Sequence, residues 1–240
     1  MSEIKSINLN TLYCSNQYQT NYLSNPSWIL PESIENINSF KLNDFTIPLS
    51  IYNIDNRNNI LSLTQGTNGP FIITIPSKNY TGLSIASSLT TALNSAGSGF
   101  NVNYQTDGSN LLTIGSTSGS FKFNTVNTGN DIYYELGLKN SLNTLTSSIT
   151  SGSIDMSGMN SLIIASNIGG ATVIGSNFKI LASIPTQGVS LSISTYQNSS
   201  DDYINLNTNL TEIQLRLYDQ RFRTIIPNKD FSLTLNFKCD

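Results

Sequence analysis

The chain has 240 residues, a formal net charge of -3 and only 11% charged residues, against about 25% in an ordinary soluble domain. This length suits one large β domain or a domain with an insertion, and it is long enough to bury a core without disulfides or metal. Hydrophobic residues make up 38%, which excludes the weakly hydrophobic, highly charged composition of disordered chains. The polar surface must therefore come from Ser, Thr, Asn and Gln, as on extracellular, adhesive and capsid proteins.

The charge balance argues against nucleic-acid binding as the main role. The chain has 12 Lys and Arg against 15 Asp and Glu, whereas neutralising phosphates takes clusters of basic residues. The nearest cluster is Arg216, Arg221 and Arg223, interleaved with Glu212 and Asp219. We interpret it as a solvated or interface strand edge, with nucleic-acid contact as the alternative.

Cysteine usage and the N-terminus indicate where the protein is made. Cys14 and Cys239 lie near opposite ends of the chain; a bridge between them is one alternative, and two free thiols in a reducing compartment are the favoured one. No apolar run approaches the roughly 18 residues of a membrane helix, and residues 1–12 lack the apolar core of a signal peptide. We expect a soluble protein made in the cytoplasm.

The first quarter of the chain predicts an arm followed by strands. Residues 1–24 are polar and read as an extended arm that orders only against a partner. Short apolar or alternating runs are typical of strands with one buried face. They occupy residues 28–30, 40–48, 60–63 and 71–76.

One convincing helix follows. Its apolar residues fall at three- and four-residue spacing and form a single face: Leu83, Ala86, Leu89 and Leu93. The side-chain oxygen of Thr81 or Ser84 can cap its first turn. We expect Gly97 to end the helix in a left-handed cap.

The remaining strands are short and separated by turn residues. A meander is predicted over 100–104, 112–114 and 121–123, and 132–138 reads as a short helix or turn. The Ser/Thr/Asn/Gly-rich stretch 139–160 predicts a domain boundary. Further strands are expected at 162–165, 178–184, 191–195, 213–217 and 231–237. This pattern favours a mainly β fold, a sandwich or jelly roll with an α+β piece between about 67 and 152.

The sequence offers little chemistry for catalysis. It contains no histidine, which removes the commonest general base and most zinc sites. It also has no CxxC pair and no glycine-rich nucleotide motif. We therefore predict a protein that is not an enzyme, with no catalytic, cofactor-binding or metal-binding residues.

Two clusters of Asp and Asn side chains are the alternatives to that prediction, as candidate catalytic or cation-binding sites. Asp201 and Asp202 form the densest carboxylate pair, and a glycosidase needs two facing acids; a solvated loop is the favoured interpretation, with calcium binding as the runner-up. A second group could hold a cation but lacks the ligand order of a calcium loop: Asp55, Asn56, Asn58 and Asn59.

Aromatic residues provide the remaining candidates for a binding site. Trp28, the only tryptophan, could stack on a sugar or a partner chain, although a core position is favoured. Tyr133 and Tyr134 could form an aromatic platform. We expect one tyrosine of the pair to face the core and the other to face solvent.

Two segments carry a resemblance to a known family. Residues 25–54, NPSWILPESIENINSFKLNDFTIPLSIYNI, and residues 71–94, FIITIPSKNYTGLSIASSLTTALN, resemble penton-type minor capsid proteins of virophages, polinton-like viruses and giant viruses. The stretches at 100–114 and 121–138 follow in the family's order, and the end, LRLYDQRFRTIIPNKDFSLTLNFKCD, resembles its closing strands. The arm and residues 139–210 match least well.

The resemblance implies a structural role in a virion. It implies a jelly roll from residues 25–66 and 153–240, an inserted outer domain at 67–152 and an arm at 1–24. Homopentamers would close the five-fold vertices of an icosahedral capsid assembled in the host cytoplasm or a virus factory. The implied partners are the major capsid protein, other minor capsid proteins and a host receptor or fibre. The alternatives are a trimeric minor capsid protein and a β-sandwich adhesin or receptor-binding module.

Overall fold

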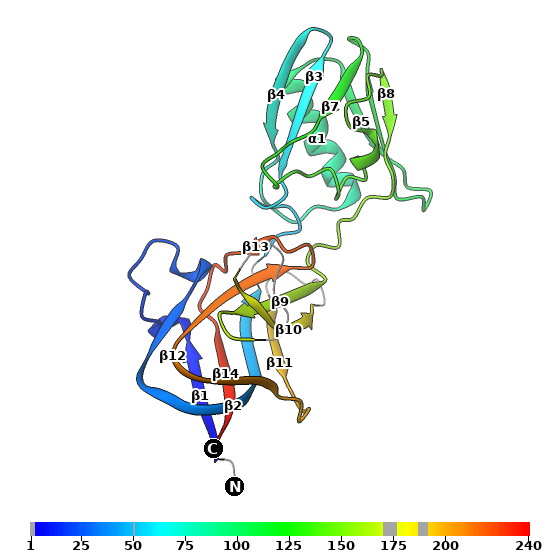
Figure 1. Cartoon of the computed structure of the whole chain (residues 1–240). Coiled ribbons are helices and arrows are strands. Elements are labelled where there is room, and N and C mark those ends of the chain that lie inside the picture. Colours follow the sequence, from blue (N-terminus) through cyan, green and yellow to red (C-terminus); the bar gives the residue numbers. More distant parts are fainter. Residues whose placement is uncertain (1–2, 50, 170–176, 187–191) are drawn as a thin grey trace. The chain divides into compact units, whose positions relative to one another are not determined.

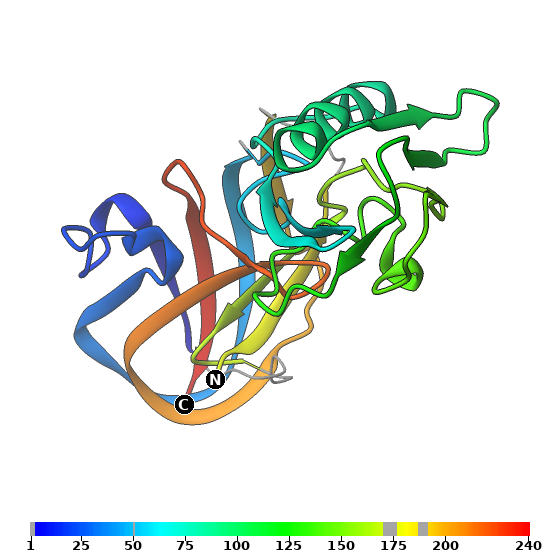
Figure 2. The ribbon, with the colours of Figure 1, turned by 90° about the horizontal axis from the view of Figure 1, so that it is seen from above.

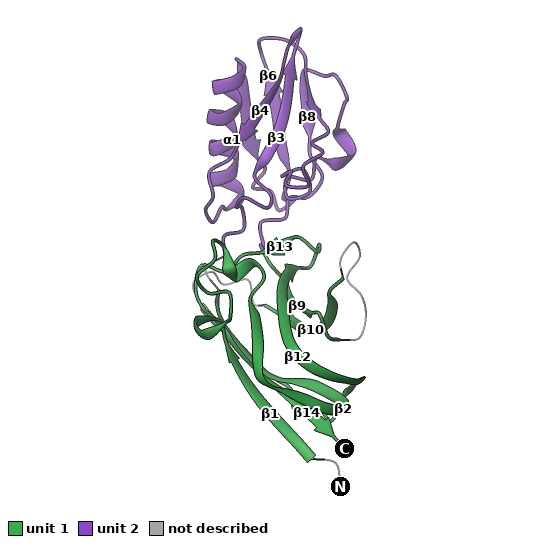
Figure 3. Cartoon of the chain, turned by 60° about the vertical axis from the view of Figure 1, so that its left-hand side comes forward, with its two compact units in different colours: residues 1–51, 159–240 green, residues 52–158 purple. Residues whose placement is uncertain are grey.

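A computed structural model describes residues 3–49, 51–169, 177–186 and 192–240. The chain divides into two compact units, unit 1 from residues 1–51 with 159–240 and unit 2 from residues 52–158 (Figure 3). Sheets in both units are antiparallel, and the described residues contain one α-helix, in unit 2 (Figure 1). The predicted fold class, mainly β of the jelly-roll type with an inserted α+β part, is confirmed.

Unit 1 is one curved antiparallel system in the order β1-β14-β2-β12-β9-β10, with β11 on β2 and β13 on β12. Two 3-10 turns, η1 (Thr11–Tyr13) and η2 (Tyr22–Ser24), follow the first strand. The strands are β1 (Glu3–Asn10), β2 (Ser27–Leu49), β9 (Ser161–Ser166), β10 (Lys179–Pro185), β11 (Ser192–Gln197), β12 (Ile204–Asp219), β13 (Thr224–Ile225) and β14 (Ser232–Cys239). Of the strand expected at 191–195, residue 191 lies outside the described residues.

Two long strands, β2 and β12, bend, so that the antiparallel system of unit 1 curves over on itself. β2 pairs with β14 and β11 through its second half and with β12 through its first half. The register of β2 with β12 shifts around Asn36 and Asn207, whose φ angles are +53° and +50°. Asn tolerates this left-handed backbone, and such bulges let a strand turn from one sheet into another. Figure 2 shows the curvature of β2 (blue) and β12 (orange).

The core of unit 1 follows from strict alternation in β14. Leu233, Leu235 and Phe237 are fully buried, and the residues between them are half-buried on the other face. Phe237 stacks on Phe40 of β2 with ring centroids 5.9 Å apart. The period of two in the sequence therefore identified the correct buried face.

The expected arm at 1–24 is corrected by the structure. Residues 3–10 form β1, which pairs along its whole length with β14, from Glu3 opposite Cys239 to Asn10 opposite Ser232. Leu9 and Thr11 are buried, and the Thr11 hydroxyl donates to Asp230 at 2.9 Å. The polar sequence misled because an edge strand buries few of its side chains.

Unit 2 consists of two three-stranded sheets, β4-β3-β7 and β5-β6-β8, and α1. Phe121 of β7 packs edge-on against Phe100 of β5 at 5.1 Å and against Phe123 at 5.6 Å, so aromatic rings join the sheets. The elements are β3 (Ile60–Gln65), β4 (Asn68–Thr74), α1 (Gly82–Ala96), β5 (Phe100–Tyr104), β6 (Leu112–Ser116), β7 (Phe121–Asn124), η3 (Lys139–Ser141) and β8 (Ser148–Thr150).

The helix caps agree with the sequence at one end and differ at the other. Thr81 is the N-cap, its side chain accepts from the Ser84 amide, and the Ser84 side chain accepts from the Thr81 amide in return. Gly97 has φ -130° and ψ -151°, so the predicted left-handed cap is wrong. A Cβ at Gly97 would lie 2.5 Å from the Gln65 side-chain oxygen and 2.8 Å from the Phe100 ring. Close packing accounts for the glycine.

The domain boundaries expected at 66/67 and 152/153 are corrected to 51/52 and 158/159. β3 pairs with β4 and β7, which places residues 60–65 in unit 2. At the other boundary, β8 extends the β5-β6 sheet and Ile154 is buried in the core of unit 2. The short strand β8 has only one buried side chain, Ile149, so the polar stretch 139–160 concealed it.

Candidate interaction surfaces

The Asp55 loop is a self-contained turn. The Arg57 guanidinium donates to both Asp55 carboxylate oxygens, with Nη2 at 2.8 Å from Oδ2. The Asn58 side chain accepts from the Asp55 amide and donates to Glu135 at 3.0 Å. The Asn59 amide donates to the Ile75 carbonyl. These bonds hold the loop against the rest of unit 2, and Arg57 already engages the Asp55 carboxylate.

Asp201 and Asp202 lie in an exposed loop of unit 1. The Asp201 side chain is fully exposed and lies 3.9 Å from the Lys41 ammonium. Asp202 accepts from the Ser200 hydroxyl at 2.6 Å. The Lys41 ammonium also donates to the Ser200 carbonyl at 2.7 Å. The pair therefore belongs to a loop anchored by Lys41, as the favoured interpretation predicted.

The arginine-rich segment forms a structured hairpin between β12 and β13. Asp219 is almost completely buried and accepts from the Arg223 guanidinium at 2.8 Å and from the Arg221 and Arg223 amides. Arg216 lies over the Phe178 ring, 4.4 Å from its centroid. Asp219 thus holds the Arg223 side chain, and the Phe178 ring lies under Arg216, both within unit 1.

Glu212 lies in the middle of β12. Its carboxylate accepts from the side chains of Gln214, at 2.8 Å, and Ser27. The hydrogen bond from Gln214, and to a smaller extent that from Ser27, holds the pKa of Glu212 below its usual value. Glu212 therefore fixes the start of β2 against β12 and remains ionised.

Trp28 is a core residue of unit 1. Its side chain is 6% exposed, and its indole N–H donates to the Asn10 carbonyl at 3.1 Å. This bond satisfies the buried donor and ties β2 to the end of β1. Trp28 is therefore unable to stack on a sugar in this fold, as the favoured interpretation predicted.

Tyr133 and Tyr134 divide between core and surface. Tyr133 is 1% exposed and Tyr134 is 48% exposed, as predicted for the pair. The Tyr133 hydroxyl accepts from the Ser62 amide at 2.7 Å and donates to the Asn124 carbonyl at 2.7 Å. Burial raises the pKa of Tyr133 to about 12. Tyr133, from the segment after β7, thus bonds both β3 and the last residue of β7.

A hollow of about 520 Å³ lies beside this pair. The Lys139 ammonium lies 5.7 Å from the centroid of the Tyr134 ring. A ring already covered by a cation offers a smaller face for stacking on a sugar. The hollow is lined by Tyr133, Tyr134, Gly137, Lys139, Asn140, Gly152, Ser153, Ile154 and Asp155.

The two cysteines are separate buried thiols. Cys239 faces Glu3 at the start of β1, whereas Cys14 follows Asn10 beyond the other end of that strand. β1 has eight residues, which span about 25 Å at 3.3 Å each. A disulfide needs Cα atoms within about 7 Å. Burial also raises the pKa of Cys14, so this thiol stays protonated at neutral pH.

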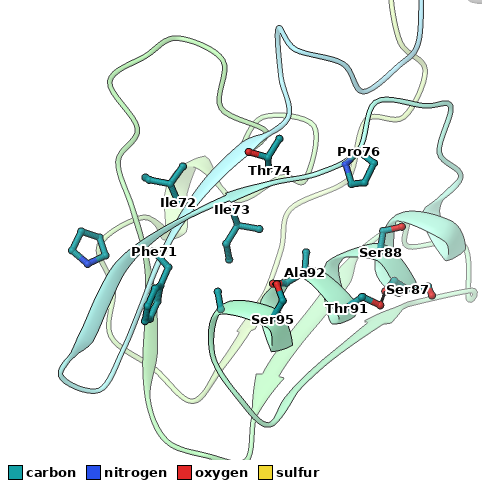
Figure 4. Close-up of a pocket in the computed structure, with 12 residues that line it drawn as sticks. Phe71, Ile72, Ile73, Thr74, Pro76, Ser87, Ser88, Thr91, Ala92 and Ser95 are labelled. Atoms are coloured by element: carbon teal, nitrogen blue, oxygen red, sulfur yellow. Dashed lines mark hydrogen bonds between the residues drawn. The ribbon is translucent and has the colours of Figure 1, made fainter.

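A second hollow could not be predicted from the sequence. It is a groove of about 730 Å³ between β4 and α1, and Figure 4 shows Ile73 directed toward the helix and Ile72 directed away from it. Ile72 is 64% exposed. One signal was available, since small residues recur along the helix at Ser88, Ala92 and Ser95. The groove lining is Pro70, Phe71, Ile72, Ile73, Thr74, Pro76, Ser87, Ser88, Thr91, Ala92, Ser95 and Ala96.

The described residues also lack two further features. No group of three or more Asp, Glu or Cys side chains in the described ranges is arranged to hold a metal ion. None of the helices in those same ranges is long and apolar enough to cross a membrane.

Comparison with known proteins yields similarity at the level of structure. No protein-family model and no curated protein matches the chain. Among solved structures it is similar to the mavirus penton protein, with 12% identity, a TM-score of 0.46, and coverage of 99% of this chain and 100% of that one. It is also similar to a two-domain fragment of the flagellar cap protein FliD from Escherichia coli, with 11% identity, a TM-score of 0.27, and coverage of 86% and 99%.

The sequence resemblance and the first of these matches name the same class of protein. Both TM-scores lie below 0.5.

Proposed function

We propose that the chain is a structural penton protein that forms homopentamers and closes the five-fold vertices of an icosahedral viral capsid. The observation that carries this proposal is the order of the motifs in the fold. The 25–54 motif contains the whole of β2, the central bent strand of unit 1. The 71–94 motif contains most of β4 and α1 of unit 2, and the closing motif contains β13 and β14.

The surface chemistry of unit 1 supports a role in a closed ring. In cyclic symmetry one patch of a subunit meets a different patch of the next. Three of the four outward residues of β14 are neutral, Ser232, Thr234 and Asn236, and the fourth is Lys238. Thr234 donates to Asp44 at 3.1 Å and Asn236 donates to Asn43 at 3.2 Å. Neutral surfaces avoid repulsion between like charges around an axis.

In this proposal unit 1 packs around the five-fold axis and unit 2 is the outward domain. The partners are other copies of the chain, the major capsid protein and other minor capsid proteins, with a receptor or a fibre at the outer unit. The location is the capsid vertex of the virion, and the role is structural rather than enzymatic. The fold of unit 1 supports this division because its two chain ends are locked together by β1 and β14.

The deciding measurement is the mass of the purified full chain by native mass spectrometry and light scattering over a concentration series. We expect a discrete pentamer. A trimer would contradict the penton proposal and favour the minor capsid alternative. A monomer at every concentration, also in the presence of the major capsid protein, would favour the adhesin or receptor-binding alternative.

A further inference from the structure

The groove between β4 and α1 lies at an unpaired sheet edge. β4 is the outer strand of the β4-β3-β7 sheet and pairs only with β3 among the described residues. The helix forms the opposite wall (Figure 4). A strand edge facing a helix across an open groove is the geometry in which domains accept an extended peptide as an added strand.

Hydrogen bonds of nearby residues show which β4 residues direct their main-chain N–H and C=O groups toward the open edge. The Ile75 amide donates to the Asn59 carbonyl at 2.8 Å, so residue 75 faces β3. The main-chain groups of Ser62, the residue opposite Ile72, are bonded on the other side by the Tyr133 hydroxyl. Alternation along the strand then directs the N–H and C=O groups of Ile72 and Thr74 toward the open edge.

The groove walls are uncharged. None of the twelve lining residues is Asp, Glu, Lys or Arg. On the helix wall, Ser88, Ala92 and Ser95 have short side chains that leave the space beside β4 unfilled. A charged group placed there would lose hydration without gaining a partner.

A second unpaired edge in the molecule shows the contrast. β1 borders only β14 among the described strands and carries Glu3 and Lys5. Charged side chains are a usual protection of an edge against further pairing. β4 has no charged residue between Asn68 and Thr74 and exposes Ile72.

We propose that this groove binds an extended, uncharged segment of a partner protein, which adds to β4 as a further strand. The open N–H and C=O groups of Ile72 and Thr74 bond the segment's main chain. Side chains on one face of the segment point at Phe71 and Ala92, which favours apolar residues at alternate positions. The proposal goes beyond the penton role and does not depend on the oligomeric state.

The test separates main-chain bonding from side-chain contact by two substitutions at one residue. Ile72→Pro removes the N–H that faces the open edge, and proline is tolerated on an edge strand when that N–H faces outward. Ile72→Ala keeps the N–H and removes the side chain. The probe is a displayed library of random peptides of about ten residues, longer than a typical strand, selected against the full chain.

We expect enriched peptides to be uncharged with alternating apolar residues, and to protect β4 amides from hydrogen exchange. We expect Ile72→Pro to weaken their binding about tenfold more than Ile72→Ala, a difference of about 1.4 kcal/mol. Equal binding to both variants would overturn the proposal, as would failure to enrich any peptide or protection confined to other strands.

A second pair of variants guards against a folding defect in Ile72→Pro. Ser95→Arg places a charge in the groove without touching the strand, and we expect it to weaken the same peptides. Asn101→Arg adds the same charge on β5, outside the groove lining, and should leave binding unchanged. Equal effects of the two arginines would contradict the groove as the site. A different outcome is that the unchanged chain binds no peptide but self-associates, and that Ile72→Pro abolishes the self-association. That result would overturn the partner-protein proposal and assign the edge to a second copy of the chain.

Discussion

The two units are built in different ways, and the difference concerns how far apart in the sequence their contacts lie. Unit 2 is one continuous stretch, 52–158, with short strands, a capped helix and its own core. Unit 1 joins the two ends of the chain, since β1 pairs with β14 and β2 with β12 and β14. These strand pairs of unit 1 can form only when both ends of the chain are present, whereas unit 2 can fold from segments that are close in the sequence.

Unit 1 should therefore depend on its terminal strand and unit 2 should not. Deleting residues 1–24 removes β1, opens the edge of β14 and uncovers part of the core around Trp28. We expect unit 1 to lose cooperative folding while unit 2 stays folded, which is a larger effect than any single substitution should produce. Two-dimensional NMR of the truncated chain would detect dispersed signals from residues 52–158 only.

An unchanged NMR spectrum for unit 1 would contradict this expectation and return residues 1–24 to the status of a separable arm. The structure argues otherwise because the segment is held at several points. The Tyr22 hydroxyl donates to Asp230 at 2.8 Å, and the Ser15 amide donates to the Ser27 carbonyl. Deleting 1–24 therefore tests folding before it tests capsid incorporation.

Alternation of apolar residues and helical spacing were sufficient to predict most elements. The alternation in β14 is a local signal, and the structure confirms it. The helical spacing also correctly places Ala86, Leu89 and Leu93 on the buried face. Leu83, expected on the same face, is exposed. Local patterns were insufficient to predict a strand whose formation depends on pairing with a distant part of the chain. β1 carries few buried residues, so its role depends on β14, more than 200 positions away.

The candidate surfaces show the same limit. The sequence predicted that one tyrosine of the adjacent pair faces the core, but not that it is Tyr133. The groove requires knowing that α1 lies opposite the free edge of β4. Small residues such as Ser88 and Ala92 mark a helix face but do not say what it faces. Only the sheet order supplies that information.

Core substitutions test whether the two units unfold separately. Phe237→Ala in unit 1 and Phe121→Ala in unit 2 each remove a fully buried ring, at a cost of about 3–5 kcal/mol. We expect two calorimetric transitions, with each variant lowering the midpoint of only one. A single transition that both variants shift equally would show that the units fold as one.

A smaller effect is expected from one hydroxyl in unit 2. Tyr133→Phe leaves the Ser62 amide and the Asn124 carbonyl without the hydroxyl at 2.7 Å from each, which costs about 1–3 kcal/mol for buried groups. The matched control is Tyr134→Phe at the exposed neighbour, where a change within about 0.5 kcal/mol is expected. Urea unfolding of both variants measures the difference, and equal losses would contradict the bridging role of Tyr133.

The smallest effect expected is a pH dependence of stability, which has a different physical cause in each unit. The Tyr22 hydroxyl donates to Asp230, and this bond raises the pKa of Tyr22 to about 12, whereas burial raises the pKa of Tyr133 to about 12. A raised pKa means that the folded state holds the proton more tightly than the unfolded one. Its contribution to stability is complete below the unfolded value near 10 and is lost as the pH rises toward 12.

Asp230→Asn should remove this dependence from unit 1 alone. The asparagine keeps an oxygen that accepts from Thr11 and Tyr22, but it has no negative charge to oppose ionisation of the tyrosine. We expect the Tyr22 pKa to fall toward 10, followed by the absorbance of tyrosinate, while Tyr133 in unit 2 keeps its raised value. A fall in both tyrosines would mean that loss of Asp230 disturbs both units, and the separation drawn between them would then be wrong.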